Sequence, residues 1–74
     1  MAEQPDELKK LVAITTDTAF TTDLRIRAIE QIGNIGSHEA LLALLDIVAN
    51  ERLTTKEREL ALDRAKKIVK SSHQ

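Results

Sequence analysis

The stretch TTDLRIRAIEQIGNI, residues 21–35, recurs in altered form as TTKERELALDRAKKI, residues 54–68. The alignment that sets residue 21 over residue 54, which we call the repeat register, also matches apolar positions upstream of both stretches. The identical pairs are Thr21/Thr54, Thr22/Thr55, Arg25/Arg58, Ala28/Ala61, Ile35/Ile68, Leu8/Leu41, Leu11/Leu44 and Ile14/Ile47. A fixed period of about 20–50 residues is typical of repeat proteins, in which each repeat is one supersecondary unit. The repeat register therefore predicts a short solenoid of helical units.

Apolar periodicity and capping residues divide the chain into four expected helices. Their approximate ranges are 5–15, 22–35, 38–50 and 55–70. Pro5 suits the first position of a helix, where its missing N–H has no partner to lose. Gly36 and Ser37 form a turn that caps the second helix in the left-handed conformation and starts the third. Thr54 and Glu57 have the spacing of a capping box at the start of the fourth helix.

Apolar residues at helical spacing predict which faces are buried. The expected inner faces are Leu24, Ala28, Ile29, Ile32 and Ile35 in the second helix, and Ala61, Leu62, Ala65, Ile68 and Val69 in the fourth. The third helix is apolar around most of its circumference, so we expect it to be the central element. Phe20 and Leu53 hold the same place before the second and fourth helices and are expected to pin those loops. Gly33 costs about 1 kcal/mol of helix propensity relative to alanine, which predicts close approach of a neighbouring helix.

Composition bounds the class of protein. The 74 residues contain no cysteine, tyrosine or tryptophan and only one phenylalanine, and the net charge is −1. We expect one all-α domain over residues 1–74, four antiparallel helices with no strand, and a frayed tail at residues 71–74. The acidic N-terminus resembles neither a signal peptide nor a transit peptide. The longest apolar stretch is far shorter than the roughly 20 residues of a membrane span. We therefore expect a cytoplasmic protein.

The run at residues 24–36, followed by residues 39–45, resembles a HEAT-like repeat of the short type found in phycobilin lyase subunits and many small bacterial proteins. The residues that carry the resemblance are Arg25, Ala28, Ile32, Gly33, Ile35, Gly36, Ala40, and Leu44 or Leu45. The resemblance implies a curved α–α superhelical stack that contacts other proteins, usually without catalysis of its own. The sequence departs from the pattern at Ser37-His38, where Asp-Pro is usual, and at Lys66-Lys67. No further helix follows residues 55–70, so their charged outer face is expected to cap the stack.

Catalytic and metal chemistry lack a supporting pattern. Glu57, Glu59 and Asp63 are expected on a solvated face with ion pairs four residues apart, because acid–base catalysis needs a pocket that shifts a pKa. His38 and His73 have no metal-ligand spacing. The serine and threonine hydroxyls lie at helix starts, where they serve as caps. We therefore expect a non-enzymatic protein without catalytic, cofactor-binding or metal-binding residues.

A protein–protein interaction module, a small scaffold or adaptor, is the function that the repeat favours. The expected partner-binding face lies on the first and third helices and comprises Lys9, Lys10, Glu39, Leu42, Asp46 and Asn50. An alternative is a nucleic-acid-associated regulator that uses the basic patch Arg64, Lys66, Lys67 and Lys70. Nucleic acid is disfavoured, because acidic residues share that helix and stacking aromatics are absent. An accessory subunit of a lyase-type enzyme is a further alternative.

Self-association is the remaining question at this level. At least three repeats are usually needed for stability, and the chain holds barely two. The apolar positions expected to be exposed are Leu42, Ile47, Ala49 and Leu60. A homodimer that covers them and complete coverage by the first and fourth helices both stay open.

Overall fold

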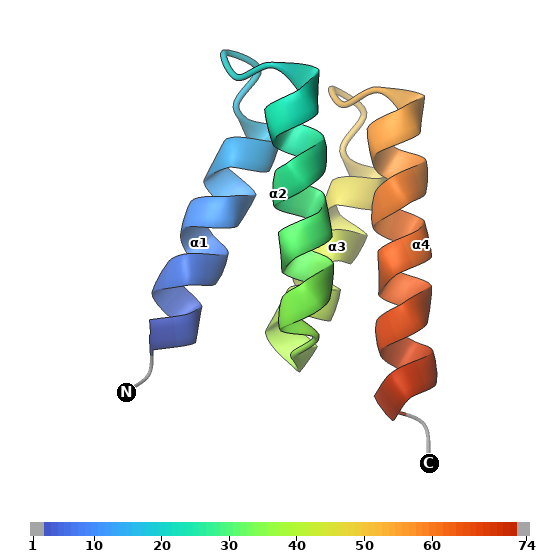
Figure 1. Ribbon diagram of the computed structural model, residues 1–74. Coiled ribbons are helices and arrows are strands. Elements are labelled where there is room, and N and C mark those ends of the chain that lie inside the picture. Colours follow the sequence, from blue (N-terminus) through green and yellow to red (C-terminus); the bar gives the residue numbers. More distant parts are fainter. Residues whose placement is uncertain (1–2, 73–74) are drawn as a thin grey trace.

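The computed structural model describes residues 3–72, which form four α-helices (Figure 1). The helices are α1 (Glu3–Thr16), α2 (Thr22–Ile35), α3 (His38–Ala49) and α4 (Thr55–Ser72). Consecutive helices run antiparallel, so loops 17–21 and 50–54 lie at one end of the molecule. The start of α1 and the end of α4 lie at the other end (Figure 1). The all-α, four-helix antiparallel fold predicted from the sequence is confirmed.

Helix bounds differ from the expected ones mainly near the chain ends. α1 begins at Glu3, so Pro5 occupies its third position rather than its first. Pro5 is still tolerated there, because N–H groups of the first turn have no intrahelical acceptor. α4 continues through Ser72, two residues beyond its expected end at residue 70, and the fraying of the tail stays a prediction. Neither glycine nor proline follows Lys70 to end the helix, and cations in the last turns favour its dipole. Residues 73 and 74 lie outside the described residues.

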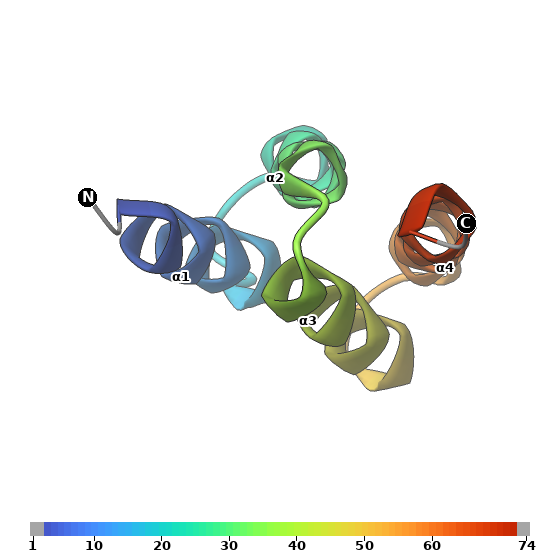
Figure 2. The same ribbon diagram turned by 90° about the horizontal axis from the view of Figure 1, so that it is seen from below.

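The helices form two layers. Viewed end-on, α2 and α4 lie in one layer and α1 and α3 in the other (Figure 2). α2 packs against all three other helices, whereas α1 and α4 lie at opposite ends and do not contact one another within residues 3–72. α3 also contacts all three other helices, so the central position predicted for α3 is shared with α2, whose contacts are more extensive. Leu42 and Leu45 on α3 are exposed. The fold is an open stack of two hairpins.

The loops that follow α1 and α3 form the same hydrogen bonds at positions matched by the repeat register. Asp17 Oδ1 accepts from the Ala19 N–H at 2.9 Å, and Asn50 Oδ1 accepts from the Arg52 N–H at 3.0 Å. The backbone bonds from Phe20 N to the Asp17 carbonyl and from Leu53 N to the Asn50 carbonyl match in the same way. The ends of α1 and α3 are aligned in this register, as are the starts of α2 and α4. The repeat register is therefore confirmed for the two loops and the helix ends that adjoin them.

Local capping follows the sequence closely. Gly36 has φ 66° and ends α2 in the left-handed conformation, as predicted. Ser37 Oγ accepts from the Ala40 N–H at 3.1 Å, and Thr21 Oγ1 accepts from the Leu24 N–H at 3.2 Å. Each hydroxyl satisfies a first-turn donor that has no intrahelical partner.

The core lies between the two layers and runs across both hairpins. Its buried members are Ile29, Ile32, Ala40, Leu44, Ile47, Leu53, Ala61, Ala65 and Ile68. Leu53 is buried and pins its loop as predicted, but Phe20 is exposed. Leu24, Leu62 and Val69, predicted on inner faces, are also exposed. Phe20 and Leu24 belong to the first hairpin and Leu62 and Val69 to the last helix, so these exposures mark the two ends of the stack.

Candidate protein-binding site

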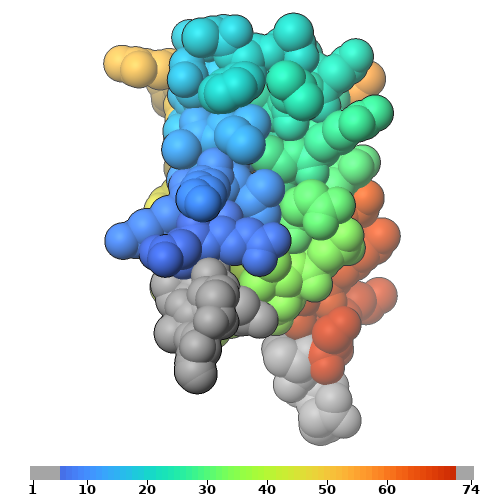
Figure 3. Space-filling model, turned by 60° about the vertical axis from the view of Figure 1, so that its left-hand side comes forward, coloured from blue at the N-terminus to red at the C-terminus, as the bar shows by residue number. Residues whose placement is uncertain are grey.

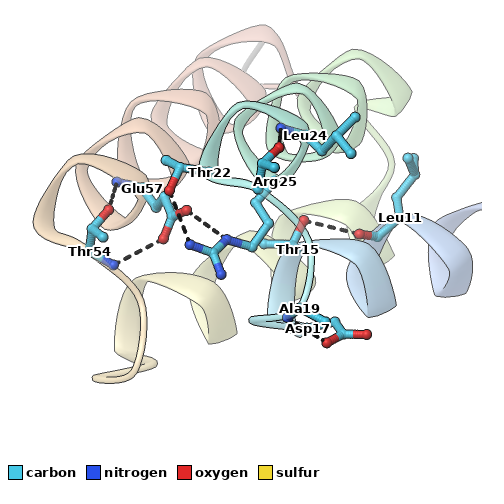
Figure 4. Close-up of polar contacts among 10 residues, drawn as sticks. Leu11, Thr15, Asp17, Ala19, Thr22, Leu24, Arg25, Thr54 and Glu57 are labelled. Atoms are coloured by element: carbon cyan, nitrogen blue, oxygen red, sulfur yellow. Dashed lines mark hydrogen bonds and ion pairs between the residues drawn. The ribbon is translucent and has the colours of Figure 1, made fainter.

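Arg25 and Glu57 form a buried ion pair at the inner interface, the contact surface between the α1–α2 hairpin and the α3–α4 hairpin. Arg25 Nε donates to Glu57 Oε2 at 2.9 Å, and the Glu57 side chain is completely buried (Figure 4). The other carboxylate oxygen, Oε1, accepts from the Thr54 N–H at 3.0 Å, which completes the predicted capping box. Arg25 also donates to Thr22 Oγ1 at 3.3 Å. Both carboxylate oxygens are thus engaged by internal donors, and the pair joins α2 to α4.

Glu57 is therefore not on the solvated face on which the sequence placed it. The capping box holds it in the first turn of α4 on the side that faces α2, whereas Glu59 and Asp63 are exposed as predicted. Asp63 Oδ2 accepts from Arg64 at 2.6 Å and lies 3.7 Å from Lys67 Nζ. Sequence reasoning missed this pair. Arg25 was singled out only as part of the repeat pattern, and its repeat equivalent, Arg58, has no carboxylate partner that would have suggested an ion pair. Arg58 Nε donates instead to the Val48 carbonyl at 3.0 Å.

Two negative findings apply to the part of the chain that the structure covers. Among residues 3–72, no three His, Cys, Asp or Glu side chains come close enough to hold a metal ion. None of the described helices is long and apolar enough to cross a bilayer. His38 is exposed at the start of α3. His73 lies outside the described residues.

A groove runs between α3 and α4 on the side away from α2. We call it the α3/α4 groove; its volume is about 540 Å³. It is lined by Leu41, Leu45, Leu62, Asp63, Ala65, Lys66, Lys67, Val69 and Lys70. Three large apolar side chains are substantially exposed there: Leu45 at 44%, Leu62 at 39% and Val69 at 52%. Leu62 also borders a separate, smaller hollow with Val48, Arg58 and Glu59, toward the start of α4.

The repeat explains why this groove is apolar. In the repeat register Leu45 is equivalent to Val12, and Leu62 is equivalent to Ile29. Ile29 is completely buried, because α3 and α4 pack against that side of α2. Leu62 has the same role in α4, but the described residues hold no helix beyond α4 to cover it. The prediction that α4 presents a charged terminal cap is wrong on this side, where Leu62 and Val69 are exposed.

The predicted partner-binding face is only partly gathered in one place. Lys9, Asp46 and Asn50 line a hollow of about 450 Å³ between α1 and α3. Lys10, Glu39 and Leu42 are not among the residues that line it, although all three are exposed. The structure therefore brings together only half of the predicted face. That this face binds a partner stays a prediction.

The predicted basic patch is divided. Lys66, Lys67 and Lys70 line the α3/α4 groove. Arg64 lies elsewhere, over Gly33 of α2: a Cβ added to Gly33 would be 3.0 Å from Arg64 Cβ and Cδ. This contact supports the prediction that Gly33 permits close approach of a neighbouring helix. Three lysines thus rim an apolar groove, and the arginine contributes to the inner interface.

Only some of the apolar positions that were expected to be exposed are exposed. Leu42 and Ala49 are exposed as predicted. Ile47 is buried in the core, so that prediction is wrong, because α1 and α2 cover this side of α3. Leu60 is half-buried against the core. Complete coverage of α3 by its neighbours is excluded by the exposure of Leu42 and Leu45.

These features define a class of structure: a stack of two α-hairpins, held together by a buried ion pair, with an open apolar groove at its C-terminal edge. Comparisons with protein-family models, curated proteins and solved structures find no match to this chain. The HEAT-like resemblance accordingly stays a prediction from the sequence.

Proposed function

We propose that this protein is a non-enzymatic protein–protein interaction module, a small HEAT-like scaffold that binds a helix of a partner protein in the α3/α4 groove. The observation that carries the proposal is the exposure of Leu45, Leu62 and Val69 along one groove. Contiguous exposed apolar side chains rimmed by polar residues are typical of protein interaction sites. Covering them releases roughly 25 cal/mol for each Å² of apolar surface removed from water.

A helix is the shape that suits this groove. The equivalent of Leu62 in the first hairpin, Ile29, is completely buried where helices of the second hairpin pack on α2. An amphipathic helix that lays its apolar face in a groove is a common mode of peptide recognition. Lys66, Lys67 and Lys70 favour acidic residues along the rim of the bound helix.

Nucleic-acid binding receives less support. The lysines border apolar side chains and share the groove with Asp63, while Arg64 lies over Gly33. A phosphate backbone would leave Leu45 and Leu62 in contact with water. An accessory role beside an enzyme is compatible with the proposal, because the enzyme would then be the protein partner.

Site-directed photocrosslinking in the native host tests the proposal. Benzoylphenylalanine at Leu45, in the groove, is expected to yield a discrete protein adduct on irradiation. The matched control is Leu24, which is 46% exposed against 44% for Leu45 but lies on α2, away from the groove. No protein adduct at Leu45, or the same adducts from both positions, would contradict the proposal.

A further inference from the structure

We infer that the occupant of the α3/α4 groove is a second copy of this chain, packed groove to groove about a two-fold axis. The inference rests on the proposed function and names the partner. In a two-fold contact the same patch is used on both copies, so the patch must be complementary to itself. A second copy could instead bind head to tail and continue the stack as its next hairpin. That arrangement requires the N-terminal edge of one copy to fit the groove side of the other.

The two ends do not fit one another. The N-terminal edge, formed by the outer sides of α1 and α2, is shown in Figure 3. In the repeat register it carries Glu7 and Lys10 where α3 has Ala40 and Ala43. Ala40 is completely buried at the inner interface, whereas Glu7 is exposed. Stacking head to tail would place the charge of Glu7 where the internal contact holds a methyl group. Polar residues at this edge are typical of a terminal cap.

The groove side of α4 also differs from the side of α2 that receives the second hairpin. A Cβ on Gly33 would lie 3.0 Å from the Arg64 side chain, and the equivalent of Gly33 in α4 is Lys66. The buried ion pair is lost as well, since Leu24 is the equivalent of Glu57 and leaves Arg58 without a carboxylate. A third hairpin from another copy would therefore lack both contacts that hold the inner interface together.

Charges along the groove are complementary to themselves when two copies are antiparallel. Glu59 lies toward the start of α4 and Lys70 toward its end, about 16 Å apart at a rise of about 1.5 Å per residue. Asp63 and Lys66 lie between them. An antiparallel second copy brings its Lys70 opposite Glu59 and its Lys66 opposite Asp63, and the two-fold axis repeats both pairs. Asp63 already pairs with Arg64 and Lys67 of its own chain, so the Glu59–Lys70 pair contributes most of the complementarity. Arg58 borders the Glu59 end with its Nε engaged by the Val48 carbonyl.

The apolar residues complete the match. Leu41, Leu45 and Leu62 lie along the middle of the groove, between the two charged ends. In the antiparallel arrangement they face the groove of the second copy. Each chain thereby covers side chains whose repeat equivalents, such as Ile29, are already buried by the second hairpin.

Sedimentation equilibrium of the purified chain is the first test. The wild type is expected at twice its 8.3 kDa mass. Leu62→Gln is expected to shift the equilibrium to monomer, and the matched control Leu24→Gln, exposed at the opposite edge, is expected to leave the dimer intact. A wild-type chain that stays monomeric at millimolar concentration overturns the inference, as does equal loss of the dimer in both variants.

Charge exchange tests the antiparallel geometry. Glu59→Lys or Lys70→Glu alone turns two attractive pairs of the dimer into repulsive ones and is expected to weaken it about tenfold, since each exposed pair contributes a few-fold. The double variant Glu59→Lys/Lys70→Glu keeps the net charge and is expected to restore the wild-type dissociation constant. Failure of the double variant to recover overturns the two-fold arrangement.

The failures of the two proposals are distinguishable. A foreign protein crosslinked at Leu45, together with a monomeric wild type, overturns the second copy as occupant and leaves the interaction module standing. No adduct at Leu45 together with a monomeric wild type overturns both. An adduct of twice the chain mass, present with Leu45 and absent with Leu24, supports both.

Discussion

At the inner interface Ile29 of α2 is completely buried, whereas its repeat equivalent Leu62 of α4 is 39% exposed in the α3/α4 groove. The two residues occupy the same position in the repeat, and both have aliphatic side chains. They differ in what lies against them, because the second hairpin packs on α2 and no described helix packs on this side of α4. Burial in a stack is therefore set by the neighbouring unit as much as by the local pattern.

The largest contrast between the two regions is the buried ion pair, which only the inner interface has. Glu57→Ala removes the partner of Arg25 and the capping carboxylate together. Breaking a buried pair on one side costs about 3–5 kcal/mol, because the remaining charge is buried without compensation. A core of this size supplies only about 3–5 kcal/mol net, so the variant is expected to be largely unfolded when measured by circular dichroism at room temperature.

Glu59→Ala, two positions further along α4 and exposed, is the matched control; at high dilution, where the monomer dominates, it is expected to change the free energy of unfolding by about 0.5 kcal/mol or less. A Glu57→Ala variant as stable as this control would show that the pair does not hold the hairpins together. Arg25→Met combined with Glu57→Gln sharpens the comparison, because it removes both charges and keeps an acceptor for the Thr54 N–H. The combination is expected to recover part of the stability lost in Glu57→Ala.

The second contrast compares equivalent apolar residues. Ile29→Ala deletes a completely buried side chain and is expected to cost about 2–5 kcal/mol. Leu62→Ala removes a side chain that already contacts water, and its cost is expected to be about 1 kcal/mol. Urea titration of both variants at high dilution, where the monomer dominates, measures the difference. Equal losses would mean that the groove is as enclosed as the inner interface.

Most of the fold was predictable from the sequence. The capping residues Ser37 and Thr54 and the left-handed Gly36 act within one helical turn, so each is specified by nearby residues. The repeat register was also correct down to the hydrogen bonds of two loops, because similar sequences in equivalent positions form equivalent turns.

The candidate site was less predictable, for a physical reason. Periodicity marks which side of α4 is apolar, and it does not say whether another helix covers that side. Leu62 and Val69 were therefore predicted to be buried, although both are exposed. The repeat register pairs Leu62 with Ile29, and it could have shown that Leu62 needs a further helix to cover it. Glu57 was placed outside, because a capping box predicts a helix start and is silent on which neighbour the carboxylate faces.

The smallest contrast is at Gly33 and its equivalent, Lys66. Alanine in place of Gly33 gains about 1 kcal/mol of helix propensity. Its Cβ, however, would lie 3.0 Å from Arg64 Cβ, which belongs to the stem of the side chain and moves only with α4. Overpacking of this kind costs about 1–3 kcal/mol, so Gly33→Ala is expected to lower the free energy of unfolding by about 1 kcal/mol net.

Lys66→Ala is the matched change in the groove, where no second hairpin approaches. At high dilution, where the monomer dominates, it is expected to leave the free energy of unfolding from urea titration within the range of ordinary surface substitutions, about 0.5 kcal/mol. The sign of the change in the free energy of unfolding of Gly33→Ala distinguishes the two effects, because helix propensity predicts an increase and overpacking predicts a decrease. If Gly33→Ala raises the urea midpoint, α4 can move away from α2 at little cost, and the two hairpins are joined by the Arg25–Glu57 pair rather than by close helix packing.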